Sequence, residues 1–244
     1  MKDRKVLFVS GASSDIGVAL IKHVAKEYET IIAHYNTTAK PLQALKEKLG
    51  DRLVMVQADF SSEHSVRCMV DTIKNMSIYP DHIVLLAASR LIVSQFRKTE
   101  KKVFEEDMTV SFYSAVEILK AFLPQMVKKR GGKVVFMLTS CTIGSPEKFI
   151  SSYVCSKYAL LGLMKSLAVE YTEKGIMINA VSPDMINTKF LNDIPELIVK
   201  NNAEKSLVGR NLSVDDVVPT VAFLLSDGAN IISGQNIGIQ SERN

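Results

Sequence analysis

Tyr153 and Lys157 are the two residues whose types and spacing point most directly to chemistry. Residues four apart project from the same face of a helix. An ammonium held near a phenol favours the phenolate, so Lys157 is expected to lower the pKa of Tyr153 from about 10. Such a phenol can exchange a proton near neutral pH, as general acid–base catalysis requires. The alternative is that Tyr153 is a half-buried structural aromatic.

A glycine-containing turn near the start of the chain supplies a second candidate site. Gly11 allows a tight turn after an apolar run, and Gly17 lets the next helix pack closely, as in a site for a dinucleotide pyrophosphate. Ser13 and Ser14 can donate hydrogen bonds to phosphate. The carboxylate of Asp15 would repel phosphate, so we expect Asp15 to be the N-cap of the helix. The alternative is an ordinary strand-to-helix turn.

Short apolar runs alternate with helical patterns along the whole sequence. Strands are predicted at 6–9, 30–35, 53–56, 82–87, 133–138, 176–181 and 236–239, and helices at 16–28, 41–49, from Ser61 or Ser62 onward, and at 99–129, 151–173 and 213–226. Pro124 is expected to break the helix at 99–129. The alternation predicts an α/β fold: a single-domain, Rossmann-like, doubly wound parallel sheet of about seven strands with helices on both faces.

Residues 184–212 interrupt this alternation. Such a stretch beside the carboxyl ends of strands commonly determines substrate specificity. We therefore expect residues 1–244 to form one dinucleotide-binding domain with a substrate loop at about 184–212.

Composition excludes several classes of function. A net charge of +4 on 244 residues is too small and dispersed to indicate nucleic acid. No segment is long and apolar enough for a membrane span. Cys68, Cys141 and Cys155 lack metal-ligand spacing and cannot all pair, which predicts a reduced, cytoplasmic setting and no metal. The four histidines are scattered and are expected to be structural.

The tyrosine–lysine pair, the serine-rich turn before it and the glycine turn resemble the classical short-chain dehydrogenase/reductase family, most of all its 3-oxoacyl-(acyl carrier protein) reductase type. The resemblance covers essentially the whole chain. It implies that Tyr153 is the general acid/base and that Lys157 lowers its pKa and holds the nicotinamide ribose. It implies that Ser140, by its spacing to Tyr153, polarises the substrate oxygen, with Thr139 and Cys141 as alternatives.

The resemblance also implies cofactor contacts. Asp59 matches the acid that holds the adenine ring, and Pro183, Ile186 and Thr188 match the lining of the nicotinamide and its carboxamide. The predicted cofactor set is Gly11, Ser13, Ser14, Asp15, Ile16, Gly17, Tyr35, Asn36, Thr37, Asp59, Phe60, Ala87, Ala88, Tyr153, Lys157, Pro183, Ile186 and Thr188.

Four departures from the family pattern stand out. Residues 85–88 read Leu-Leu-Ala-Ala in place of Asn-Asn-Ala-Gly, whose amides brace the central sheet. Ser111 replaces an asparagine that orders a water in a proton relay, and is kept as a catalytic candidate. Asp184 replaces a glycine, and residues 240–244 replace an acidic-Gly-Gly motif.

Residues 34–38, at the end of the second predicted strand, contain no acidic residue to bind a ribose 2′-hydroxyl. A 2′-phosphate would meet no repulsion there and could bond Asn36, Thr37 or Thr38. The sequence therefore favours NADP(H) over NAD(H). The alternative is a polar loop that discriminates weakly.

These observations predict an NADP(H)-dependent oxidoreductase acting on a ketone or secondary alcohol, with a 3-oxoacyl thioester as the leading substrate. Lys129 and Lys174 could then meet an acidic carrier protein, although solvated surface positions are the simpler interpretation. The alternative substrate is a polyketide-, steroid- or sugar-like alcohol of secondary metabolism. A different class, a catalytically weak cofactor-binding scaffold or redox sensor, is suggested by Ser111 and Leu85–Leu86. Family likeness implies a homodimer or homotetramer through the helices at 99–129 and 151–173.

Overall fold

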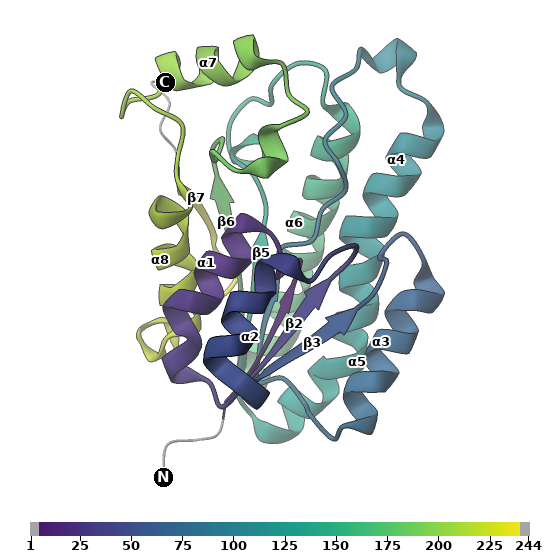
Figure 1. Cartoon of the computed structure of the whole chain (residues 1–244), viewed down its shortest axis with the longest axis vertical. Helices are drawn as coiled ribbons and strands as arrows, with labels where there is room; N and C mark the ends of the chain where they lie inside the picture. Colours follow the sequence, from purple (N-terminus) through teal and green to yellow (C-terminus); the bar gives the residue numbers. More distant parts are fainter. Residues whose placement is uncertain (1–4, 240–244) are drawn as a thin grey trace.

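A parallel seven-stranded sheet forms the centre of the computed structural model, which describes residues 5–239 (Figure 1). The strands are β1 (Val6–Ser10), β2 (Thr30–Tyr35), β3 (Leu53–Gln57), β4 (His82–Leu85), β5 (Gly132–Met137), β6 (Ile176–Pro183) and β7 (Asn236–Ile239). Their order is β3-β2-β1-β4-β5-β6-β7. The chain therefore winds outward in two directions from β1, and the order reverses between β1 and β4. Ligands of such sheets bind at this reversal, beside the carboxyl ends of the strands.

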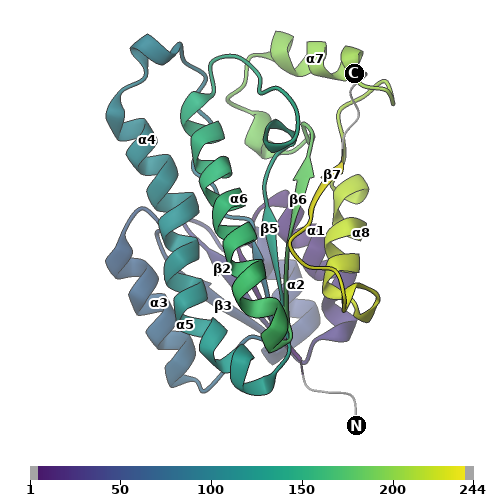
Figure 2. The ribbon, with the colours of Figure 1, turned by 180° about the vertical axis from the view of Figure 1, so that it is seen from behind.

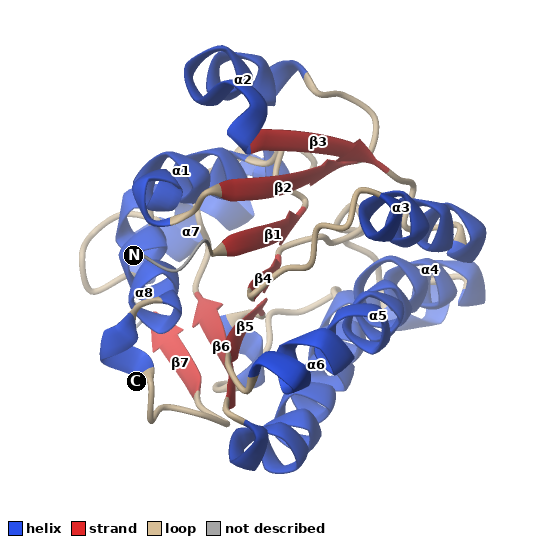
Figure 3. Cartoon of the chain, turned by 90° about the horizontal axis from the view of Figure 1, so that it is seen from below, coloured by secondary structure: helices blue, strands red, loops and turns tan. Residues whose placement is uncertain are grey.

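Helices cover both faces of the sheet (Figure 3). One face carries α1 (Asp15–Val24), α2 (Gln43–Leu49) and α8 (Val214–Leu225). The other carries α3 (Glu63–Asn75), α5 (Ser114–Lys129) and α6 (Ser151–Tyr171). Each face has its own apolar core, because the strands present buried side chains on both sides. The predicted fold class is confirmed.

The interruption in the long helical stretch lies at a different place from the one predicted. Pro124 lies inside α5, where Leu123 and Met126 are buried against the sheet, so packing holds the helix together despite the proline. The break instead occurs at Met108–Tyr113, a π-helical segment between α4 (Lys101–Asp107) and α5. Such segments occur often at functional sites. Figure 2 shows α4 and α6 side by side, and the two helices are in contact.

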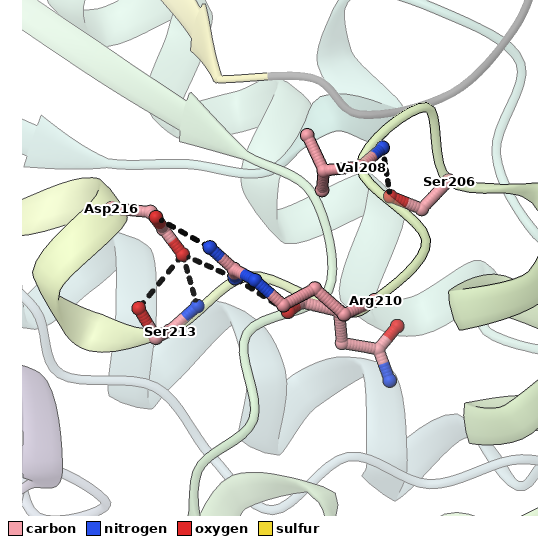
Figure 4. A network of polar contacts seen from close by, with 6 residues as sticks. Ser206, Val208, Arg210, Ser213 and Asp216 are labelled. Atoms are coloured by element: carbon pink, nitrogen blue, oxygen red, sulfur yellow. Dashed lines mark hydrogen bonds and ion pairs between the residues drawn. The ribbon is translucent and has the colours of Figure 1, made fainter.

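Residues 184–212 leave the sheet after β6 and contain a short 3-10 helix (Lys189–Leu191) and the α-helix α7 (Glu196–Lys205). Ile186 and Leu212 pair at the base of this segment. Arg210 then forms a two-point ion pair with Asp216, at 2.6 and 3.0 Å, and Asp216 also accepts hydrogen bonds from the backbone and hydroxyl of Ser213 (Figure 4). These contacts hold the pKa of the Asp216 carboxyl well below its usual range. The returning end of the segment is thereby fastened to the start of α8.

Two expected absences can be examined within residues 5–239. No helix in this range is long and apolar enough to cross a membrane. No group of three histidine, cysteine, aspartate or glutamate side chains in the same range could hold a metal ion. The altered terminal motif, 240–244, lies outside the described residues.

Candidate active site

A cavity of about 800 Å³ opens at the carboxyl ends of the strands, where the sheet order reverses. Its lining comes from the glycine turn after β1, the loops after β4 and β5, the first turns of α6, and the segment after β6. The distant regions marked out by the sequence motifs therefore share one concave site, as expected for a cofactor and a substrate bound together.

The glycine turn requires glycine at both positions. Gly11 has φ of +64°, and a Cβ there would lie 3.2 Å from the Ala87 backbone nitrogen. A Cβ on Gly17 would lie 2.6 Å from the Ala12 carbonyl oxygen. Ser14 caps α1, since its hydroxyl accepts from the Gly17 N–H at 3.1 Å and donates to the Gly11 carbonyl at 2.7 Å. The helix α1 thus begins at the cavity. The backbone N–H groups of its first turn have no partner within the helix and favour an anion.

Asp15 is not the N-cap, so that prediction is wrong; the adjacent Ser14 does this. The Asp15 carboxylate instead accepts a hydrogen bond from the backbone N–H of Lys189 at 2.8 Å, with the Lys189 ammonium 3.8 Å away. Its charge is therefore met by a cation from the segment after β6. The partner is 174 positions away in the sequence, so no local pattern could have revealed it.

His34, which the sequence treats as one of four scattered histidines, supports the glycine turn. Its Nδ1 accepts the Gly11 N–H at 3.0 Å, so Nε2 carries the proton and donates to the Ala58 carbonyl at 3.0 Å. The ring stacks on Phe60 with centroids 3.9 Å apart. Burial lowers the pKa of His34 to about 4, which keeps the ring neutral near pH 7. The sequence signal that could have revealed this role is the position of His34 near the end of β2, next to β1, where the strand order reverses.

The loop after β4 is braced without the family's amide side chains. The buried Ser10 hydroxyl accepts the backbone N–H groups of Leu86 and Ala87, at 3.0 and 3.2 Å. These bonds tie the end of β4 to the end of β1, directly below the glycine turn. Ser10 therefore braces the loop at which the resemblance implied a loss of amide contacts.

Tyr153 and Lys157 lie one turn apart at the start of α6, and both line the cavity. The Lys157 ammonium is buried, lies 5.5 Å from the centre of the Tyr153 ring and donates to the Met137 carbonyl at 2.9 Å. Burial lowers the pKa of Lys157 to about 8. Burial also raises the pKa of Tyr153 above its ordinary value, with a hydrogen bond to the Thr139 side chain opposing the rise. This direction is opposite to the sequence expectation, because desolvation of the phenolate outweighs any help from Lys157.

Ser140 and both of its alternatives line the cavity. Ser140 is partly buried in a short turn after β5, with Thr139 and Cys141 buried on either side. The Ser140 hydroxyl donates to the Asp184 carboxylate at 3.4 Å. Asp184, noticed in the sequence only as a departure, thus places an acceptor beside the candidate serine.

The π-helical segment and the end of α4 before it contain one expected and one unexpected residue, Ser111 and Asp107. Ser111 is buried but is not among the residues that line the cavity, whereas its neighbour Val110 is. Asp107, the last residue of α4, is buried and accepts a hydrogen bond from the Ser89 hydroxyl. The charge of Asp107 raises the pKa of Lys157, against the effect of burial. The sequence did not distinguish Asp107 from the neighbouring acidic residues, because only burial separates them.

Most of the predicted cofactor set lines the cavity. The lining includes Gly11, Ser13, Ser14, Asp15, Ile16, Asn36, Phe60, Ala87, Ala88, Tyr153, Lys157, Pro183, Ile186 and Thr188. Gly17, Tyr35, Thr37 and Asp59 are not among the lining residues. Tyr35 packs against the apolar core, and Asp59 accepts hydrogen bonds from the backbone and hydroxyl of Ser61 at 2.9 and 2.8 Å.

Comparison with known proteins agrees with this geometry. A family model described as enoyl-(acyl carrier protein) reductase matches residues 11–241. The "NADPH-dependent aldehyde reductase-like protein, chloroplastic" of Arabidopsis thaliana is 31% identical, covering 96% of this chain and 92% of its own length. The 3-oxoacyl-[acyl-carrier-protein] reductase FabG of Staphylococcus aureus is 25% identical over 98% of both chains. The crystal structure of levodione reductase, 22% identical, superposes with a TM-score of 0.88 over 97% of this chain and 96% of that one.

Proposed function

The chain belongs to the short-chain dehydrogenase/reductase family, oxidoreductases that act on alcohol or carbonyl groups, and we propose that it transfers hydride between NADP(H) and a ketone or secondary alcohol. The observation that carries this proposal is the single cavity lined by the glycine turn, Ser140, Tyr153 and Lys157. One cavity thereby combines a binding site for the cofactor pyrophosphate with an acid–base group for the substrate.

The residues present fit a dinucleotide. Gly11 has no Cβ where the chain passes the Ala87 backbone, and the first residues of α1 line the cavity, where their N–H groups would favour a phosphate. Ser13 would add a hydroxyl donor, while Lys189 offsets the charge of Asp15. Pro183, Ile186 and Thr188 would line the nicotinamide. When bound, the cofactor supplies or accepts the hydride.

The chain's own residues handle the oxygen and its proton. Ser140 would orient the substrate carbonyl, and Tyr153 would donate its hydroxyl proton as the alkoxide charge develops. A phenol with a raised pKa stays protonated and is ready to donate. Below about pH 8 Lys157 carries a positive charge, which would stabilise the phenolate left behind.

A preference for NADP(H) is supported by the end of β2. Asn36 and Thr38 line this part of the cavity and carry no negative charge. The Arabidopsis relative is named as NADPH-dependent, which agrees with the same preference.

The substrate alternatives remain a 3-oxoacyl thioester, as the name of the staphylococcal relative suggests, and a secondary-metabolite alcohol. Lys129 bonds Asp81 at 2.5 Å, and Lys174 lies over the Tyr171 ring. Both lysines precede strands, β5 and β6, and so lie at the edge of the sheet opposite the cavity. They give no support to carrier docking at the site. We further propose a cytoplasmic homodimer or homotetramer assembled through α4, α5 and α6.

A scaffold or redox-sensor role is the second candidate. The hydrogen bond from Ser140 to Asp184 favours it, because a hydroxyl proton held by a carboxylate is not offered to a substrate. Tight NADPH binding without oxidation by a broad panel of carbonyl compounds would support this role.

The decisive test replaces Tyr153 with Phe. Loss of the proton donor is expected to lower kcat about 10²- to 10⁴-fold while NADPH affinity, followed by nicotinamide fluorescence, stays within about twofold. Tyr158→Phe is the matched control, since Tyr158 lies on the same helix but is largely exposed. Full activity in Tyr153→Phe would reject the assignment. Titration with NADH in parallel tests the cofactor preference.

A further inference from the structure

The part of the cavity beyond Tyr153 is lined by apolar side chains. These residues form one packed cluster, here called the apolar chamber: Leu91, Val93, Cys141, Ile150, Tyr153, Leu191, Ile194 and Ile198. Among these eight, the polar groups are the Tyr153 hydroxyl and the Cys141 thiol. The chamber residues therefore offer a substrate one strong hydrogen-bonding group, the Tyr153 hydroxyl. Ser140 and the buried Asn202 also line the cavity, and the Asn202 amide donates to Asn211 at 2.9 Å.

Three separate segments assemble the apolar chamber. Leu91 comes from the loop after β4, Ile150 from the loop after β5, and Ile194 from the segment after β6. The first two loops are joined by a hydrogen bond from the Ser94 N–H to the Phe149 carbonyl at 2.7 Å. The chamber is thus a formed part of the fold with a defined wall on each side.

Two aromatic rings add apolar surface at the cavity. Phe190 is 39% exposed, with its ring centroid 6.2 Å from that of Tyr153, and Phe149 is 48% exposed; both line the cavity. Aromatic rings of this kind gain stability when an apolar ligand removes them from water.

Two ion pairs lie near the cavity. Arg90 and Asp193 form an ion pair at 2.6 Å between the loop after β4 and the segment after β6. Lys189 and Asp15 pair across the glycine turn. Glu147 and Lys148 also line the cavity, so the charges around it are of both signs and do not form the strip of cations that an acidic carrier would need.

We propose that the substrate is a free, predominantly apolar ketone or aldehyde whose hydrocarbon body fills the apolar chamber while its carbonyl oxygen reaches Tyr153. This rests on the proposed function. In the step, the carbonyl carbon gains hydride from NADPH, the C=O π bond breaks, and Tyr153 protonates the oxygen; the carbonyl compound is reduced and NADPH is oxidised to NADP⁺. A polyhydroxylated ketone is disfavoured, because its hydroxyl groups would lose water without gaining partners.

Ligand binding to the Tyr153→Phe variant, saturated with NADPH, separates recognition from chemistry. Calorimetry would compare 2-decalone, L-sorbose and a 3-oxooctanoyl pantetheine thioester. We expect 2-decalone to bind at least about 10-fold more tightly than L-sorbose. Ile194→Asn is expected to weaken 2-decalone binding about 10-fold. Ile231→Asn is the matched control, because Ile231 is 94% exposed. Ile198→Asn, at a partly buried position, serves as a second variant if Ile194→Asn fails to fold.

The binding results either support or overturn the inference. Tighter binding of 2-decalone that is lost in Ile194→Asn or Ile198→Asn and kept in Ile231→Asn supports the inference. Equal or tighter binding of L-sorbose or of the thioester, no binding of any probe, or no effect of either chamber variant overturns it. Turnover is measured separately with Tyr153 intact: 2-decalone that binds but never oxidises NADPH would reject the proposed function and leave the apolar specificity standing.

Discussion

The two ends of the cavity are held in shape by different forces. At the glycine turn, backbone groups are bonded at fixed distances by His34, Ser10 and Ser14, and two positions admit no side chain. At the apolar chamber, side chains from three loops pack against one another, and the Ser94–Phe149 backbone bond joins two of these loops. Hydrogen-bonded backbone tolerates little change, whereas apolar packing tolerates substitutions that conserve volume. The proposed cofactor end of the cavity is therefore expected to tolerate fewer substitutions than the proposed substrate end.

Protonation of His34, at the glycine turn, is expected to have the largest effect on stability. Its folded pKa of about 4 lies below the unfolded value of about 6.5, so the unfolded chain binds more protons in between. Stability linked to His34 is present above pH 6.5 and is lost as pH falls toward 4, by about 3 kcal/mol in the free energy of unfolding. We expect His34→Asn to remove this part of the acid loss, measured by urea denaturation at several pH values. The acid loss of stability that comes from His82, whose pKa is also about 4, is expected to remain in this variant.

His23→Asn is the control for this measurement, because His23 is exposed and lies outside the glycine turn. If the stability of His34→Asn falls with pH as steeply as that of the wild type, protonation of His34 does not account for the acid loss.

Adding one methyl group to the glycine turn is the next largest change. In Gly17→Ala the new Cβ meets backbone atoms that cannot move aside, so we expect a loss of about 1–3 kcal/mol in the free energy of unfolding and weaker NADPH binding. Gly162→Ala is the matched control on α6, where nothing lies within 4 Å; it should stabilise the protein by up to about 1 kcal/mol. Equal effects of the two substitutions in urea denaturation would mean that the turn is less restricted than its geometry indicates.

The smallest expected effect comes from a substitution near Lys157, between the glycine turn and the apolar chamber. Asp107 raises the pKa of Lys157, so Asp107→Asn should lower that pKa below its value of about 8. Lys157 would then lose its charge at lower pH, and the alkaline fall in kcat/KM should move to lower pH, reducing activity at pH 8 by roughly 2- to 10-fold.

A pH–rate profile measures this shift, with Glu106→Gln on the exposed side of α4 as the control. An alkaline limb that stays in place in Asp107→Asn would show that Asp107 acts only in folding.

Local patterns predicted most of the fold. The strands at 30–35 and 236–239 have the predicted bounds, and the cap of α3 is Ser62, one of the two predicted residues, because strand and cap signals depend on residues within a few positions. The break near Pro124 was predicted wrongly, because burial of the residues around it comes from helices and strands distant in the sequence.

What the sequence by itself determined is the type of each element and the spacing of chemical groups within it. Tyr153 and Lys157 must share a helix face, and Gly11 and Gly17 must frame one turn. Only the tertiary structure decided which distant groups meet: Asp15 with Lys189, His34 with Gly11, Asp107 near Lys157, and the three loops of the apolar chamber. Helix and strand periodicities repeat every few residues, whereas the partner and the burial of a polar group depend on packing between segments far apart in the chain.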